Sequence, residues 1–194
     1  MRELVYYVAS TLDGFIAAPD GSYDFFPLMP EPDVLAHLAA EWPQTFPTFA
    51  HTQLGIDSPP AGRFDALVMG RSTYDPALKL GVTSPYAHLK QYVFSRSLPP
   101  SEDPQVEIVD ADPVTFVRDL KRQPGGDIWL CGGGQLAGQL LGEVDELVVK
   151  LNPIVAGSGV PLANREFAPH RFTLVEACPF DSGLVLLRYT AGMR

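Results

Sequence analysis

The strongest chemical signal in the sequence is a run of three glycines at positions 132–134, placed between an apolar segment and a helix-like stretch. The apolar segment, residues 128–131, is typical of a buried strand, and residues 135–141 are predicted to form a helix. Where glycines replace side chains, the backbone can approach a pyrophosphate, and the N–H groups of a helix start favour an anion. The segment therefore predicts a pyrophosphate site, with a tight turn that serves only packing as the alternative.

Two other predicted strands also end in groups that suit a phosphate. The residues that follow these strands are Gly70, Arg71, Ser72 and Thr73 after residues 66–69, and Ser95 and Arg96 after residues 92–94. A cation and hydroxyl donors at a helix start can hold a phosphate. Because ligands bind beyond the carboxyl ends of parallel strands, three such ends favour one common site. The alternative is that Arg71 is an ordinary surface residue and that Ser72 only caps a helix.

The common nucleotide and metal motifs are absent from the sequence. Gly132, Gly134 and Gly138 give GxGxxxG rather than the dinucleotide fingerprint GxGxxG, and no GxxxxGK[ST] phosphate loop occurs. Without metal-ligand spacing, no metal site is predicted, and the histidines are expected to be surface or capping residues. These histidines are His37, His51, His88 and His170.

Two further polar residues suggest a role near a substrate. Lys150 lies in the apolar, strand-like segment 147–151, on the face opposite Leu147 and Leu151. A lysine there is costly to bury unless it is paired or faces a wet cleft. We therefore predict that Lys150 faces the substrate, with a sheet-edge lysine that reaches solvent as the alternative. Asp13, before a glycine, is either a substrate contact or a turn former.

The elements that must position these residues follow from the hydrophobic pattern. Strands are predicted at residues 4–9, 66–69, 92–94, 128–131 and 147–149, with one nearer an edge at 106–109, helices at 33–41, 113–122 and 135–141, and a terminal hairpin at 172–177 and 184–189. This order predicts an α/β fold with a mostly parallel sheet and antiparallel edge strands. Residues 1–194 are predicted to form one domain, in which residues 43–62 are a flap or insertion.

Composition narrows the possible partners. A net charge of −9 and a pI near 4.8 argue against nucleic acid and anionic membranes as partners. Cys131 and Cys178 show no CxxC spacing, so we expect no disulfide and a cytoplasmic location. The first apolar run ends at Ser10, which predicts neither a signal peptide nor a transmembrane helix.

In chain order, these segments resemble the dihydrofolate reductase superfamily, whose fold is a three-layer sandwich. The resemblance is greatest to its riboflavin-biosynthesis branch, the C-terminal reductase domain of the deaminase-reductase, and to small uncharacterised relatives. Residues 8–17 are similar to the first strand and active-site loop of the family, and residues 69–74 to its MGRxTY/W segment. Residues 94–96 are similar to the strand end at the 2′-phosphate, and residues 132–134 to the glycine turn. Residues 145–162 also match.

The resemblance implies NADPH as the cofactor and a homodimer as the assembly. The implied cofactor-binding residues are Ala9, Ile16, Gly70, Arg71, Ser72, Thr73, Ser95, Arg96, Gly132, Gly133, Gly134, Gln135 and Leu136. Dihydrofolate reductases carry a carboxylate in the helix after the first loop, and Asp33 is the candidate here. Asp33, Lys150 and Asp13 are therefore the predicted catalytic residues. Lys150 replaces the family's threonine and Ala137 its aromatic residue after the glycine turn, which argues against folate.

The leading hypothesis is an NADPH-dependent reductase of a small heterocyclic or ribosylamino-pyrimidine substrate. It would resemble 5-amino-6-(5-phosphoribosylamino)uracil reductase in riboflavin biosynthesis and would transfer a hydride to a C=N or C=O carbon. One alternative is an NADPH- or nucleotide-binding protein without turnover. Another is a dihydrofolate reductase that acts on a pterin.

Overall fold

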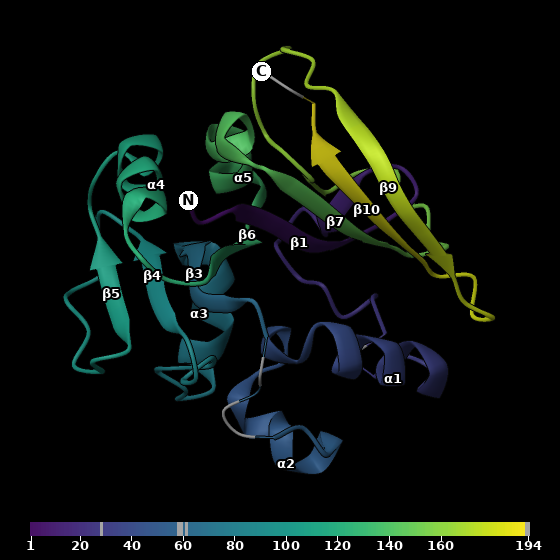
Figure 1. Cartoon of the computed structure of the whole chain (residues 1–194), viewed down its shortest axis with the longest axis horizontal. Coiled ribbons are helices and arrows are strands. Elements are labelled where there is room, and N and C mark those ends of the chain that lie inside the picture. Colours follow the sequence, from purple (N-terminus) through teal and green to yellow (C-terminus); the bar gives the residue numbers. More distant parts are fainter. Residues whose placement is uncertain (28, 58–59, 61, 193–194) are drawn as a thin grey trace.

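The computed structural model describes residues 1–27, 29–57, 60 and 62–192. Its main sheet consists of β1 (Leu4–Ser10), β3 (Phe64–Gly70), β4 (Lys90–Phe94), β5 (Val106–Val109), β6 (Asp127–Gly132), β7 (Glu146–Leu151), β9 (Phe172–Pro179) and β10 (Val185–Ala191). The strand order is β5-β4-β3-β6-β1-β7-β10-β9 (Figure 1). Neighbours from β5 to β7 are parallel, whereas β10 is antiparallel to both β7 and β9. The predicted mixed sheet, its edge strand β5 and its terminal hairpin are confirmed.

Helices cover both faces of the sheet and complete three layers (Figure 1). The helices are α1 (Pro32–Glu41), α2 (His51–Leu54), α3 (Arg71–Lys79), α4 (Pro113–Arg122) and α5 (Gly134–Leu140). One apolar core joins α1 and α3 to the sheet, and a second joins α4 and α5 to the opposite face. Because successive strand residues point to opposite faces, β1 places Val5 and Tyr7 in the first core and Leu4 and Tyr6 in the second.

Helix α4 shows how local sequence sets these elements. The Asp112 carboxylate accepts a hydrogen bond of 2.9 Å from the Thr115 N–H, and Pro113 occupies the first helical position. Both features satisfy or remove N–H groups that a helix start leaves without partners. The predicted bounds of this helix are confirmed.

A short antiparallel ribbon was not predicted from the sequence. It pairs β2 (Phe15–Ala17) with β8 (Val160–Pro161), two segments too short to show periodicity. The strands approach closely, since a Cβ added to Gly159 would lie 2.3 Å from the carbonyl oxygen of Ala17. The ribbon therefore fixes the first loop against the chain that follows β7.

The sequence predicts neither a transmembrane helix nor a disulfide. Within the described ranges, no helix has the length and apolar character needed to cross a membrane. Cys131 and Cys178 are both free, in agreement with the prediction of no disulfide.

The predicted flap, residues 43–62, is in its first part packed against the core. The short helical turns Pro43–Thr45 and Thr48–Ala50 precede α2, and the side chain of Gln44 is buried. The Gln44 amide accepts a hydrogen bond of 2.7 Å from the Phe64 N–H and donates one to the Phe64 carbonyl. Positions 58, 59 and 61 lie outside the described residues, and the idea that the whole stretch is an insertion stays a prediction.

His51 is not a surface residue, which corrects the sequence prediction for this histidine. His51 is buried, and its ring lies 4.7 Å from the ring of half-buried His88, measured between centroids. The ring nitrogens of His88 lie 2.8 Å from the Thr48 hydroxyl and 2.9 Å from the Gln44 carbonyl oxygen. A neutral imidazole satisfies both partners, because it accepts at one nitrogen and donates at the other. His88 thus ties residues 44–48 to the loop before β4.

Folding stability should fall as the pH is lowered through the range in which His88 titrates. Burial lowers the pKa of His88 below its ordinary value of 6.5. The unfolded chain therefore takes up a proton at a higher pH than the folded protein does, and acid favours unfolding below about pH 6.5. Urea unfolding at pH 7.5 and pH 5.5 should show a smaller acid loss in His88→Gln than in the wild type. Exposed His170 provides the matched control, and an unchanged acid loss in His88→Gln would contradict the expectation.

Candidate active site

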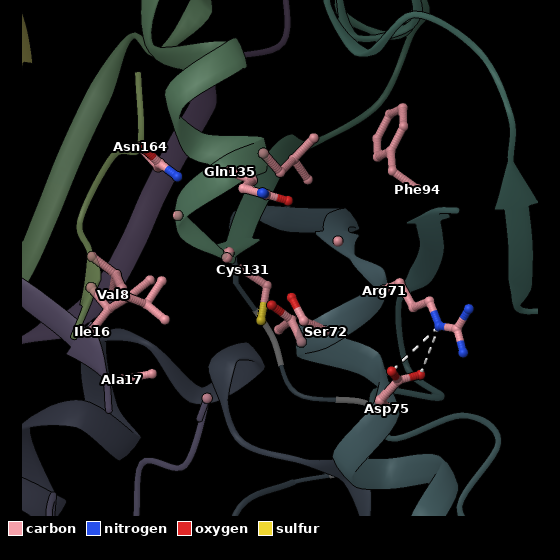
Figure 2. Close-up of a pocket in the computed structure, with 18 of the residues that line it drawn as sticks. Val8, Ile16, Ala17, Arg71, Ser72, Asp75, Phe94, Cys131, Gln135 and Asn164 are labelled. Carbon is pink, nitrogen blue, oxygen red and sulfur yellow. Dashed lines mark hydrogen bonds and ion pairs between the residues drawn. The ribbon is translucent and has the colours of Figure 1, made fainter. Parts of the chain in front are cut away.

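A cleft of about 1060 Å³ opens across the carboxyl ends of the parallel strands. All thirteen residues predicted to bind a cofactor line it, namely Ala9, Ile16, Gly70, Arg71, Ser72, Thr73, Ser95, Arg96, Gly132, Gly133, Gly134, Gln135 and Leu136. They come from the ends of β1, β3, β4 and β6, the ribbon strand β2 and the starts of α3 and α5. In Figure 2, Ile16 and Ala17 lie on the other side of the pocket from Arg71 and Phe94. Residues far apart in sequence are thus brought together as predicted.

The three glycines at the end of β6 differ in whether backbone conformation or packing requires a glycine at each position. Gly132 has a φ of +133°, a conformation that side chains disfavour. A Cβ on Gly134 would lie 2.3 Å from the Pro161 carbonyl oxygen, so this position is required for packing. Gly133 has an ordinary φ of −87°, and its Cβ would come no closer than 3.4 Å to any atom, the Thr73 hydroxyl oxygen. Neither a positive φ nor a close contact of the Cβ requires a glycine at this position, which lines the cleft.

The predicted phosphate end lies at the start of α3. Gly70 is the N-cap and makes no side-chain cap, so the positive end of the helix faces the cleft beside the Ser72 and Thr73 hydroxyls. Arg71 donates to the Ser97 hydroxyl over 2.5 Å, and its Nε lies 3.4 Å from the Asp75 carboxylate (Figure 2). The exposed guanidinium of Arg71 is therefore held between Ser97 and Asp75.

The second arginine is held less firmly. The Arg96 side chain is 95% exposed and lies 3.9 Å from the Asp110 carboxylate, a distance that makes a weak surface ion pair. Ser95 orders the turn that contains Arg96, since the Ser95 hydroxyl oxygen accepts from the N–H groups of Ser97 and Leu98. Arg96 is thus free to reorient toward an anion at the cleft rim.

Asp13 does not reach the cleft, which corrects its predicted catalytic role. Its carboxylate accepts from the Thr11 hydroxyl over 2.6 Å, from the Ala156 N–H over 3.1 Å and from the Gly157 N–H over 2.7 Å. These hydrogen bonds, that of Thr11 first, lower the pKa of Asp13 to about 2. Asp13 is therefore an anchor between the first loop and the segment after β7, as in the alternative of a turn former.

Asp33 is also not brought to the cleft. It lies exposed in the first turn of α1 and does not line the pocket. The buried face of α1 carries Val34 and Leu38, and packing of that face turns Asp33 toward solvent. The prediction that Asp33 supplies a substrate carboxylate does not fit this geometry.

Lys150 lines the cleft. It shares a sheet face with Val148 and Tyr7, opposite the face that carries Leu147 and Leu151. Its Nζ lies 4.7 Å from the centroid of the Tyr7 ring, and no ion pair to it exists among the described residues. Burial lowers the pKa of this amine from 10.5 to about 8.

Comparison with known proteins identifies the family of this chain. Residues 65–186, well over half of the chain, match the family described as the RibD C-terminal domain. The chain belongs to this family. It is 31% identical over 163 residues to the uncharacterized protein YwjB of Bacillus subtilis, covering 83% of this chain and 82% of YwjB. The resemblance drawn from the sequence motifs is confirmed.

Solved structures show the fold of this RibD C-terminal domain protein. It superposes with a TM-score of 0.72 on a Shewanella sp. PV-4 protein named for riboflavin biosynthesis, at 24% identity and over 100% of both chains. Dihydrofolate reductase from Enterococcus faecalis, solved with NADP(H), gives a TM-score of 0.65 at 16% identity, over 98% of this chain and 97% of that one. The predicted dihydrofolate reductase-like three-layer fold is confirmed.

The cleft of this RibD C-terminal domain protein also contains aromatic residues that were not predicted from the sequence. Tyr7, Tyr86 and Trp129 line it beside Cys131 and Lys150. The Trp129 ring lies edge-on to Tyr86 at 4.9 Å and to Tyr7 at 6.3 Å, between centroids. In the sequence these residues lie in apolar runs or in a loop, so nothing separated them from core residues. Burial raises the pKa of Tyr7 and raises that of Cys131 to about 12, so both groups stay protonated at neutral pH.

Proposed function

We propose that this protein is an NADPH-dependent reductase of a small heterocyclic or ribosylamino-pyrimidine substrate. The observation that carries the proposal is that all thirteen predicted cofactor residues line one cleft in a member of the RibD C-terminal domain family. A cleft of this size can enclose a dinucleotide and a small substrate together. A homodimer and a cytoplasmic location remain predictions.

The residues present fit an NADP(H) molecule. Arg71, Ser72 and Thr73 would hold phosphate oxygens through charge and hydroxyl donors, and Arg96 would hold the 2′-phosphate at the rim. Gly133 leaves open the space that a pyrophosphate needs. When bound, the nicotinamide supplies a hydride to a C=N or C=O carbon of the substrate. The ribbon residues Ile16 and Ala17 would orient the ring end and exclude water.

The other end of the cleft supports a planar substrate. Tyr7, Tyr86 and Trp129 offer aromatic surface, and Lys150 offers a cation for a carbonyl or anionic group. A pterin would need a carboxylate facing its amidine nitrogens, and Asp33 is exposed outside the cleft. This argues against the pterin alternative. A nucleotide-binding protein without turnover would give a different result in the experiment below.

Turnover provides the direct test of the proposal. The purified protein should consume NADPH, measured by absorbance at 340 nm, with 5-amino-6-(5-phosphoribosylamino)uracil and not with dihydrofolate. NADPH binding without consumption of NADPH by either compound would favour the nucleotide-binding alternative. Consumption with dihydrofolate alone would favour the pterin alternative.

NADPH should bind more tightly than NADH. In the double variant Arg71→Ala with Arg96→Ala, NADPH affinity should fall about tenfold, roughly 1.4 kcal/mol, because two exposed cations would be lost opposite a phosphate. NADH affinity should fall less, because NADH lacks the 2′-phosphate that Arg96 would hold. Fluorescence titration of both cofactors measures this, with Arg122→Ala as the control, an exposed arginine paired with Asp119 outside the cleft. Equal affinities in the wild type would contradict the role given to the arginines.

A further inference from the structure

The charged residues of the cleft are unevenly distributed. Among the described residues that line it, four charged side chains lie at the phosphate end, in two pairs: Arg71 with Asp75, and Arg96 with Asp110. The fifth, Lys150, stands alone at the carboxyl end of β7. Strand β1 separates β7 from β6, which carries the glycine turn. Lys150 is therefore set apart from the phosphate end and belongs to the part left for the substrate.

Among the described residues, the surroundings of Lys150 hold no acidic side chain that pairs with it. From β1, Tyr7 places its ring under the amine, and from β6, Cys131 places its thiol nearby. Tyr86, from the loop before β4, faces Cys131, and β10 opposes Lys150 with apolar Leu186. The Tyr7 hydroxyl is buried, with the Thr45 side chain beside it. Lys150 is thus a cation in an aromatic part of the cleft, where its N–H groups can donate to an acceptor atom on a ligand.

We propose that Lys150 is the proton donor of the reduction, an inference that rests on the proposed function. As the hydride reaches the carbon of a C=N or C=O group, the π-electron pair of that bond moves to the nitrogen or oxygen. That atom takes a proton from the Lys150 ammonium, which becomes a neutral amine and regains a proton from water. NADPH is oxidised to NADP⁺, and the substrate is reduced by two electrons and two hydrogens.

The alternatives within the pocket are weaker acids. Burial holds the pKa of Cys131 at about 12 and raises those of Tyr7 and Tyr86, so none of them gives up a proton readily at neutral pH. The Lys150 amine has a pKa lowered to about 8 by burial, which suits a general acid near pH 7.

This role gives turnover a defined pH dependence. Below about pH 8 Lys150 carries its proton and can donate it, whereas above that pH the neutral amine cannot. We therefore expect kcat to be level near neutral pH and to fall tenfold per pH unit on the alkaline side. If Lys150 only attracted a charged substrate, the change would be in KM.

The test compares wild-type protein with Lys150→Arg and Lys150→Met, using NADPH and 5-amino-6-(5-phosphoribosylamino)uracil. Arginine keeps the positive charge but does not release a proton in this pH range. Both variants should therefore lose about 100-fold in kcat, a typical contribution of general acid catalysis, and should show no alkaline fall in their residual rates. NADPH affinity should stay within about twofold, which also reports on folding.

A second measurement does not depend on turnover. Acetic anhydride labels neutral amines, and mass spectrometry can follow the label on Lys150, with exposed Lys79 as the reference site. Labelling of Lys150 should rise through about pH 8 and then level off. Labelling of Lys150 that still rises at pH 10 would overturn the proposal.

The outcomes separate this proposal from the proposed function. If the wild type turns over and Lys150→Arg keeps the wild-type kcat, the protein is a reductase but Lys150 is not the proton donor. The same conclusion follows if the residual rate of Lys150→Met still falls at alkaline pH. Absence of any turnover by the wild type overturns the reductase and the donor role together. Loss of kcat in both variants, with the alkaline fall removed and NADPH binding kept, supports the assignment.

Discussion

Gly133→Val should lose NADPH binding by at least about 100-fold, roughly 2.7 kcal/mol, while the fold survives. The backbone of Gly133 has a φ of −87°, which valine adopts readily. Its Cβ would meet only the Thr73 hydroxyl at 3.4 Å and the Ser72 hydroxyl at 3.7 Å. The added methyl groups would therefore project between the starts of α3 and α5, where the proposal places the pyrophosphate.

Fluorescence titration with NADPH measures the loss, and a thermal melt checks the fold. Gly192→Val is the matched control, because that glycine lies just after β10, outside the cleft, and its Cβ would lie 3.7 Å from its nearest neighbour, the Arg171 carbonyl oxygen. Gly134→Val is unsuitable, since its Cβ would overlap the Pro161 carbonyl and disturb the fold directly. Normal NADPH binding by folded Gly133→Val would reduce the glycine turn to a structural feature.

The sequence was sufficient to locate the cofactor end of the cleft because glycines, hydroxyls and arginines directly follow apolar strands there. Gly133, Ser72 and Arg96 are recognisable from local spacing alone, and the parallel order of the strands brings their ends together. Side chains that act through local backbone geometry can be predicted in this way.

The substrate end could not be predicted in the same manner. Tyr7 and Trp129 occupy inward positions of buried strands, where an aromatic residue normally serves packing alone. Asp33 is predicted to be catalytic because of its position in the helix after the first loop. The packing of Val34 and Leu38, however, decides which side of α1 faces inward. Which inward-facing residues border a cleft depends on contacts between distant elements, and no local pattern contains that information.

The fold itself followed from periodicity wherever an element was long enough to show it. The eight strands of the main sheet and the helices α1, α4 and α5 were predicted, whereas the four-residue helix α2 and the two- and three-residue strands β8 and β2 were not. His51 was misjudged for a related reason. A buried histidine is stabilised by specific partners, here the Phe46 carbonyl oxygen at 3.0 Å, which the sequence does not reveal.

At the opposite end of the sheet from the cleft, a buried carboxylate carries the largest expected effect on stability. Glu146 begins β7 with 3% of its surface exposed. It accepts hydrogen bonds of 2.9 Å from Arg63, which immediately precedes β3, and of 2.6 Å from Arg188 on β10. Arg63 also pairs with Asp127 at the start of β6 over 2.7 Å. One carboxylate thus links elements from both halves of the sheet.

Glu146→Ala should lower the free energy of unfolding by about 2–4 kcal/mol. Removal of one member of a buried pair leaves the other charges without compensation, at a cost of roughly 3–5 kcal/mol when they are fully buried. Solvent at Arg63 and Arg188, whose side chains are 28% and 38% exposed, reduces that cost. Urea unfolding measures the change, and Glu176→Ala, at an exposed position of β9, should change stability by less than about 0.5 kcal/mol.

Cofactor binding distinguishes this effect from damage to the cleft. Glu146 pairs in register with Val5 and Thr190 near the amino end of β1, whereas the cleft lies at the carboxyl ends. Folded Glu146→Ala should therefore bind NADPH with an affinity within about twofold of the wild type. A variant as stable as the wild type would show that Arg63 and Arg188 find equivalent partners in solvent or in the neighbouring carboxylates Asp127 and Glu3, and that Glu146 does not hold the two halves of the sheet together.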